Sequence, residues 1–176
     1  MITGENIILR APEPSDIDLL YQWENVQSLW HFSNNNTPFS KFSIEQFILN
    51  AGQDIYTLKQ IRLMIELKDA TVAGCIDLFD FDPQHSRAGI GLLVFEPYRK
   101  KGYATEAIGL IKKYAFDILH LHQLYCNILA NNEASMKLFQ KLNFKIAGIK
   151  KEWVKYNYQW QDEIILQLIN PTTIPH

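Results

Sequence analysis

The sequence predicts an α/β (α+β) protein with one mixed, mostly antiparallel sheet of about seven strands and helices on both faces. Two observations lead to this fold class. In the centre of the chain apolar residues alternate with polar ones, which is the period of a half-buried strand. Elsewhere apolar residues recur every three to four positions, which is the period of a helix packed on one side. The patterns follow the order strand, helices, three strands, helix, strand, helix, two strands.

A single domain is expected to span residues 1–176. The chain is 47% hydrophobic and 20% charged, and no run rich in Pro, Gly or Ser divides it. The net charge of −2 argues against nucleic acid or an anionic membrane as a partner. We find neither a signal peptide nor an apolar run long enough for a bilayer, so we expect a soluble cytoplasmic protein. Cys75 and Cys126 lie in apolar runs and are expected to be reduced core residues.

The N-terminal third is expected to contain one strand and two helices. Residues 6–10 are strand-like, and Ser15 is placed to cap a first amphipathic helix. Residues 30–42 show no regular period. Ser43, with a glutamine three residues later, forms the capping-box pattern that precedes a second short helix.

Three strands and a long helix are expected in the centre. Apolar and polar residues alternate in 61–67. The runs 72–81 and 87–95 are joined by the turn-forming sequence DPQHS, which predicts an antiparallel hairpin. After Gly102 the period becomes helical, and apolar residues share one broad face as far as residue 119.

The C-terminal part is expected to add a strand, a helix and a final pair of strands. The strand covers 123–130, and Asn131 or Asn132 can cap the helix that follows. Asn143 suits the left-handed position at the end of that helix. The last two strands flank a turn at 157–159.

The segment FEPYRKKGYATEA, from Phe95 to Ala107, combines three features of a phosphate-binding loop. Arg99, Lys100 and Lys101 supply positive charge, and Gly102 lets the backbone approach a ligand closely. The predicted helix that follows presents free N–H groups at its positive end. The pattern is neither a Walker loop nor a dinucleotide fingerprint. We interpret it as a pyrophosphate site; a solvated surface turn is the alternative.

Two motifs resemble those of a known family. LLVFEPYRKKGYATEAI resembles the acetyl-coenzyme A loop of the GNAT N-acetyltransferases, whose pattern is Arg/Gln-x-x-Gly-x-Gly/Ala. NNEASMKLFQKLNF resembles the family's later helix, with its Asn-x-x-Ser and Leu-Tyr-x-Lys-Leu-Gly-Phe positions. Within the family, the region around IDLFDFDPQHSRAGIG is similar to bacterial spermidine (diamine) and ribosomal-protein N-terminal acetyltransferases. The resemblance implies acetyl-coenzyme A as cosubstrate and direct attack by a primary amine in a ternary complex.

The resemblance also implies which residues bind the cosubstrate. The backbone N–H of Val94 is the implied oxyanion donor. Phe139 stands where many members have a tyrosine that protonates the leaving thiolate, and phenylalanine has no proton to give. Tyr125, Tyr156, Tyr158 or solvent could supply the proton instead. The implied cosubstrate-binding residues are Leu92, Leu93, Val94, Arg99, Lys100, Lys101, Gly102, Tyr103, Ala104, Thr105, Asn132, Ser135 and Phe139.

The acceptor side is less determined by the sequence. Glu66, Asp77 and Asp80 are candidate bases, directly or through water, and Asn127 could orient the amine; each could equally be an ordinary strand residue or ion-pair partner. Asp82 adds to the acidic character and favours a polyamine or diamine. A protein N-terminus as acceptor and an inactive coenzyme A-binding domain stay open, as does a homo-oligomer. The histidines lack metal-ligand spacing, so no metal is expected.

Overall fold

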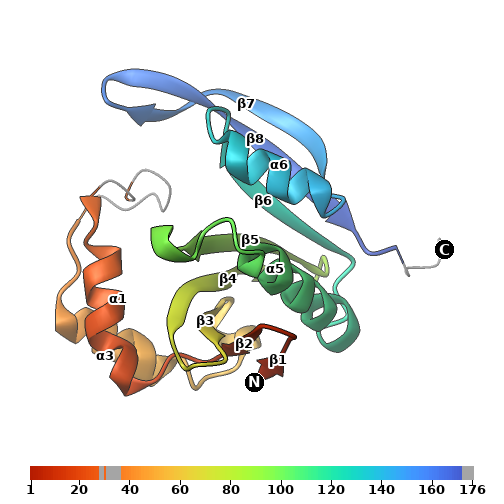
Figure 1. Cartoon of the computed structure of the whole chain (residues 1–176). Helices are drawn as coiled ribbons and strands as arrows, with labels where there is room; N and C mark the ends of the chain where they lie inside the picture. Colours follow the sequence, from red (N-terminus) through yellow and green to blue (C-terminus); the bar gives the residue numbers. More distant parts are fainter. Residues whose placement is uncertain (28–29, 31–36, 172–176) are drawn as a thin grey trace.

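The computed structural model of this chain describes residues 1–27, 30 and 37–171, which form an eight-stranded sheet with helices packed against it (Figure 1). The predicted fold class is confirmed. The strands are β1 (Ile2–Thr3), β2 (Ile7–Arg10), β3 (Ile61–Leu67), β4 (Val72–Asp82), β5 (Arg87–Val94), β6 (Gln123–Leu129), β7 (Lys145–Tyr156) and β8 (Gln159–Ile169). The helices are α1 (Ile17–Glu24), α3 (Lys41–Asn50), α4 (Ile55–Leu58), α5 (Tyr103–Lys113) and α6 (Glu133–Lys141).

The strands are arranged in the order β1-β2-β3-β4-β5-β6-β8-β7. Neighbouring strands are antiparallel except β5 and β6, which pair in parallel. The two-residue β1 is the strand that the sequence did not predict. No described helix is long and apolar enough to cross a membrane.

The sheet buries a different set of side chains on each face. Ile76 of β4 belongs to the same buried cluster as Ile108 of α5 and Phe139 of α6, so we call this side the α5 face. Cys75, the preceding residue, packs with Leu20 of α1 and with α3 on the opposite side, the α1 face. Successive strand residues point to opposite faces, which explains the division. Both cysteines are buried and free, as predicted.

Two helix starts differ from the predictions. α3 is capped by Ser40, whose hydroxyl oxygen accepts a hydrogen bond from the N–H of Ser43 at 3.0 Å. The predicted cap at Ser43 is therefore wrong by about one turn, because serines stand at both positions and the helix takes the earlier one. The predicted cap at Ser15 is also wrong, since a short 3-10 turn, Pro14–Asp16, precedes α1 and is held by Glu13 and Asp16.

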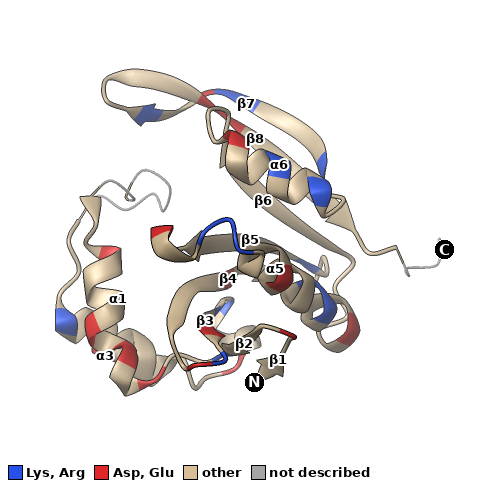
Figure 2. Cartoon of the chain, viewed as in Figure 1, with Lys and Arg blue, Asp and Glu red and all other residues tan. Residues whose placement is uncertain are grey.

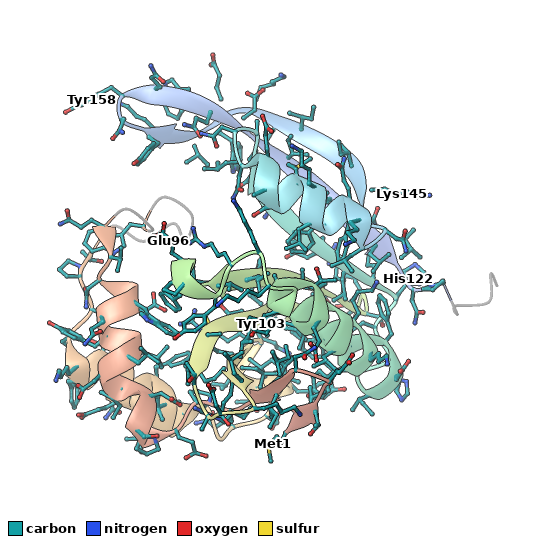
Figure 3. All side chains as sticks on the ribbon, in the orientation of Figure 1. Met1, Glu96, Tyr103, His122, Lys145 and Tyr158 are labelled. Atoms are coloured by element: carbon teal, nitrogen blue, oxygen red, sulfur yellow. The ribbon has the colours of Figure 1, made fainter. Side chains whose placement is uncertain are left out.

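The two turns at the C-terminal end form as predicted. Asn143 follows α6 with a φ of 71°, the left-handed conformation expected of it. Asn157 and Tyr158 join β7 to β8 with φ values of 48° and 62°. Positive φ at both central residues is the geometry of a tight hairpin turn. Tyr158 lies at the tip of this long hairpin, away from the body of the sheet (Figure 3).

The N-terminal segment is attached to α5 by one carboxylate. Glu106 accepts hydrogen bonds from the backbone N–H and the side-chain amide of Asn6, at 2.9 and 3.1 Å. Burial opposes the charge, but these hydrogen bonds outweigh it and lower the pKa of Glu106 below its ordinary value. The contact fixes the start of α5 against β2.

Gly74 lets β4 and β5 approach each other closely. A Cβ at this position would lie only 2.1 Å from the carbonyl oxygen of Leu93 and 3.0 Å from Cα of Val94. These are backbone atoms in a paired strand, so they cannot move aside as a flexible side chain can. The position of the end of β5 therefore depends on a glycine in β4.

We predict that Gly74→Ala lowers the free energy of unfolding by about 1–3 kcal/mol, because the methyl group forces the two strands apart. Urea denaturation of the purified variants measures this. Gly109→Ala is the matched control: among the described residues, no atom outside the nearby backbone of its own helix lies within 4 Å of the added Cβ, and alanine suits a helix interior better than glycine. Equal stability of the two variants would contradict the close-packing argument.

Candidate active site

β5 and β6 diverge beyond a short ladder (Figure 1), and we call the region between their diverging backbones the slot. The two strands pair only from Arg87–Gly89 to Gln123–Tyr125, whereas β5 stays paired with β4 as far as Val94. The far half of β5 therefore has a free edge on the side of β6. α5 and α6 lie side by side on the same face of the sheet, one on each side of the slot (Figure 1).

The free edge of β5 exposes peptide groups at alternate residues. The N–H of Phe95 donates to the carbonyl of Ala73 at 2.9 Å, so it points toward β4. Since the peptide groups of a strand alternate in direction, those of Leu92 and Val94 point into the slot. Arg99 confirms the direction at Val94, whose carbonyl accepts from its Nε at 2.8 Å. The backbone of Leu93 faces β4 instead.

The loop after β5 holds its three cations near the mouth of the slot, where Figure 2 shows it as a blue segment before α5. Lys100 and Gly102 adopt left-handed conformations, with φ of 60° and 90°. Within the described residues, no atom beyond those of its two chain neighbours lies within 4 Å of a Cβ added to Gly102. Glycine is thus required here for its backbone conformation, and the space beside it is open.

The first turn of α5 begins directly after Gly102. The N–H of Glu106 makes the first helical hydrogen bond, to the carbonyl of Gly102 at 3.1 Å. No side chain caps the helix, which leaves the N–H groups of Tyr103, Ala104 and Thr105 available to an anion. Tyr103 stands at this end of α5 (Figure 3). The loop and the helix terminus thus present positive charge and donors together.

α6 forms the other wall of the slot. Asn132 caps it, and its side-chain oxygen accepts from the N–H of Ser135 at 3.2 Å. Phe139 is 4% exposed and packs edge-to-face on Phe144, with ring centroids 5.1 Å apart. The two polar residues lie at the end of α6 that follows β6, while Phe139 belongs to the core.

On the α1 face, Asp77 belongs to a charged cluster. Arg62 donates from Nε and Nη2 to its two carboxylate oxygens, at 2.8 and 2.9 Å. The same guanidinium donates from Nη1 to Glu24 at the end of α1. The cluster lines a hollow of about 330 Å³ whose other walls include Phe39, Phe47 and Phe79.

Glu66 belongs to a different cluster. Its carboxylate accepts from Nε of Arg10, whose other nitrogens donate to Asp16 at 2.7 and 3.0 Å. Asp16 is 4% exposed; burial opposes its charge, but Arg10 and the N–H of Glu13 lower its pKa. Glu66 lies four residues beyond Arg62 along β3, so the structure separates it from Asp77.

Between these strands and β6, β5 carries glycine on its α1 face at positions 89 and 91. Gly91 pairs with Asp77, and Gly89 pairs with Phe79, whose ring would lie 2.4 Å from a Cβ on Gly89. The ring of Phe79 meets Tyr125 of β6 edge-to-face, with centroids 6.0 Å apart. The ring of Phe79 therefore covers Gly89, whereas Asp77 and Phe79 lie only at van der Waals distance from the space above Gly91.

The hydroxyl of Tyr125 is hydrogen-bonded to Asp80 and does not point freely into the slot. It donates to Oδ2 of Asp80 at 3.2 Å, and burial, followed by the charge of Asp80, raises the pKa of Tyr125 to about 12. Asp80 has a φ of 48° at an irregularity in the β4–β5 ladder. Both line a second hollow, of about 580 Å³, with Asp82 and Arg87.

Sequence reasoning missed Arg62 and Glu24, which surround Asp77. Arg62 alternates with apolar residues in β3. That pattern predicts on which face of the sheet its side chain lies, but it does not predict the ion-pair partner. Asn127 is exposed on β6, on the same face as Tyr125. In the described ranges, 1–27, 30 and 37–171, no group of three or more His, Cys, Asp or Glu residues is arranged to hold a metal ion.

The chain is similar in sequence to known acetyltransferases. The sequence pattern of the acetyltransferase (GNAT) domain matches residues 6–145. An SPbeta prophage-derived uncharacterized N-acetyltransferase of Bacillus subtilis is 29% identical, over 83% of this chain and 80% of its own length. The spermidine N(1)-acetyltransferase of Escherichia coli K12 is 27% identical, over 93% of this chain and 86% of its own length.

A solved structure shares the fold over nearly the whole length of both chains. It is the spermidine N-acetyltransferase of Vibrio cholerae in complex with CoA and spermine, with a TM-score of 0.85 and 20% identity, covering 94% of this chain and 96% of that one. The family pattern spans most of the chain, including the slot, the cationic loop and the start of α6. This chain therefore belongs to the GNAT family of N-acetyltransferases.

Proposed function

We propose that the protein transfers the acetyl group of acetyl-coenzyme A to a primary amine of a small polyamine or diamine. The observation that carries the proposal is the free edge of β5, which ends at a cationic loop and an uncapped helix. Acetyl-coenzyme A supplies the thioester and a pyrophosphate that suits this terminus.

The chain offers groups that fit two parts of this cosubstrate, the pyrophosphate and the pantetheine arm. The N–H groups of 103–105, with the cations of 99–101 and the open space beside Gly102, fit the pyrophosphate. The slot-facing peptide groups of Leu92 and Val94 fit the amides of the pantetheine arm. Asn132 and Ser135 extend the site on the α6 side.

The acceptor amine is proposed to arrive over Gly91 on the α1 face. Asp77 stands beside this path and Asn127 stands across the slot on β6. Val94 contributes its N–H as oxyanion donor. Holding both reactants in line supplies most of the catalysis, up to about 7–11 kcal/mol. Glu66 is occupied by Arg10, so we assign it a structural role.

Proton transfer is proposed to use solvent. The attacking nitrogen forms its bond to the carbonyl carbon, the carbon–sulfur bond breaks, water takes the proton of the amine and solvent protonates the thiolate. Phe139 has no proton to give. Tyr125 retains its phenolic proton, since its pKa is about 12. Tyr158 is 94% exposed at the hairpin tip, away from the site.

A polyamine or diamine acceptor is supported by the charge beside the 330 Å³ hollow and by the named relatives. Two carboxylates and one guanidinium beside the 330 Å³ hollow leave a net negative charge, and its aromatic walls suit an alkylammonium chain. The named relatives that act on spermidine point the same way. Phe139 favours the second candidate, an inactive domain that binds coenzyme A.

An amine panel tests the function directly. We expect thiol release from acetyl-coenzyme A with spermidine, spermine or a diamine, and weaker release with monoamines or with a peptide N-terminus. Chromatography of the acetylated product identifies the amine that reacted. Tight binding of acetyl-coenzyme A without turnover of any amine would favour the inactive domain instead.

We predict that Gly102→Glu weakens acetyl-coenzyme A binding at least tenfold, measured by calorimetry, because the carboxylate enters the open space and repels the pyrophosphate. Gly102→Ala is the control, since it shares the backbone penalty of about 1–2 kcal/mol but adds neither charge nor bulk. If both variants bind as tightly as the unmodified chain, the pyrophosphate lies elsewhere.

We predict that Phe139→Tyr keeps or raises kcat, because the change restores a proton donor at a position where the chain has only packing. The added hydroxyl enters a core site that is 4% exposed, so thermal stability should fall slightly. Steady-state kinetics and thermal melting measure the two effects. A large loss of kcat with intact folding and cosubstrate affinity would contradict the proposed place of Phe139.

A further inference from the structure

Arg62 is the single cation of the cluster on the α1 face. It uses three nitrogens on two carboxylates, both oxygens of Asp77 and one of Glu24. Its side chain is 23% exposed, and its guanidinium carbon lies 5.4 Å from the centre of the Phe47 ring. Burial works against the charge, but Asp77 and Glu24 outweigh it and raise the pKa of Arg62 above its ordinary value.

Asp77 lies directly beside the part of β5 that borders the slot. It pairs with Gly91, and a Cβ on Gly91 would be only 3.8 Å from its Oδ2. The next residue, Leu92, turns its peptide group into the slot. The orientation of this carboxylate therefore matters to any amine that approaches a thioester held at the free edge.

The groups that face Asp77 come from five elements. α1 contributes Glu24 and β3 contributes Arg62. From β4 itself comes the buried thiol of Cys75, whose pKa is raised to about 12 by burial and then by Asp77. α3 contributes the uncharged Phe47, and β5 contributes only glycine at this level. Within the described residues, Arg62 is the cation bound to Asp77.

We propose that Arg62 is a positioning residue for acetyl transfer, which holds the carboxylate of Asp77 fixed beside Gly91. Both Asp77 oxygens are bound by a permanent cation, so the carboxylate attracts the ammonium form of the acceptor and does not compete for its proton. This inference rests on the proposed function, because it assigns Asp77 to the acceptor side of the same site.

Removing Arg62 would leave two carboxylates facing each other without a cation. In such a variant the negative charge of each carboxylate disfavours the ionised form of the other. Asp77 would then lose its charge or its orientation while the amine is being recruited. The consequence should be visible in the acidic part of the pH profile and in KM for the amine.

The test is the pH dependence of kcat/KM for the best amine of the panel, at saturating acetyl-coenzyme A. We expect Arg62→Met to lose activity on the acidic side about one pH unit or more above the unmodified chain. We also expect its KM for the amine to rise at least tenfold. Arg62→Lys keeps the charge and should retain the ordinary profile, with a smaller rise in KM.

Arg10→Met provides the matched control. Arg10 also bridges two carboxylates on the same side of the sheet, Asp16 and Glu66, but lies away from Gly91. The Arg10→Met variant should have a lower free energy of unfolding but the same pH profile of kcat/KM and the same KM for the amine as the unmodified chain. The double variant Arg62→Met, Asp77→Asn should lack the added acidic step, which would assign that step to Asp77.

The outcomes separate the two proposals. If the unmodified chain turns over amines and the Arg62→Met profile and KM match those of Arg10→Met, the role of Arg62 is rejected while the proposed function stands. If the unmodified chain acetylates no amine, the proposed function fails. Should Arg62→Met not fold, Arg62→Lys decides: an unchanged KM would reject the role of Arg62.

Discussion

The short parallel pairing of β5 with β6 is the constraint on which the rest of the structure depends. Three residue pairs hold the two strands together, and beyond Gly89 each strand keeps only its other neighbour. A sheet that continued its ladder would satisfy its own peptide groups and leave nothing for a ligand. Because the ladder stops, Leu92 and Val94 direct polar groups into a slot between two helices. The cationic loop and the uncapped α5 lie at its mouth.

The other face of the sheet shows two arginine bridges with different consequences. Arg10 joins β2, the turn before α1 and β3 through Asp16 and Glu66, and thereby fixes the edge of the sheet to the helical layer. Arg62 joins β3, α1 and β4 in the same manner, but its partner Asp77 borders the glycines of β5. Similar local chemistry thus serves architecture at one place and the acceptor side at the other. The difference lies only in what the neighbouring strand carries.

The sequence predicted most strands because their alternation is local. The hairpin of β4 and β5, the helix after Gly102 and the left-handed Asn143 all depend on patterns within a few residues, and all are present. The start of α3 was missed because Ser40 and Ser43 both suit a cap. The partners of Asp77 could not be predicted, since they require the register of β3 and the packing of α1. The resemblance indicated that Leu92 and Val94 bind the cosubstrate, but periodicity alone gives no sign of where β5 and β6 part.

The loop between β5 and α5 has its shape set by the chain's own contacts. Arg99 is bound to the carbonyl of Val94, and Lys100 and Gly102 are held in left-handed conformations. Conformational entropy of the backbone is therefore lost when the protein folds and does not have to be lost again when a diphosphate binds. The entropy loss of ordering this loop therefore lowers the stability of the fold, where the packing of the whole sheet offsets it, and does not weaken the binding of the diphosphate.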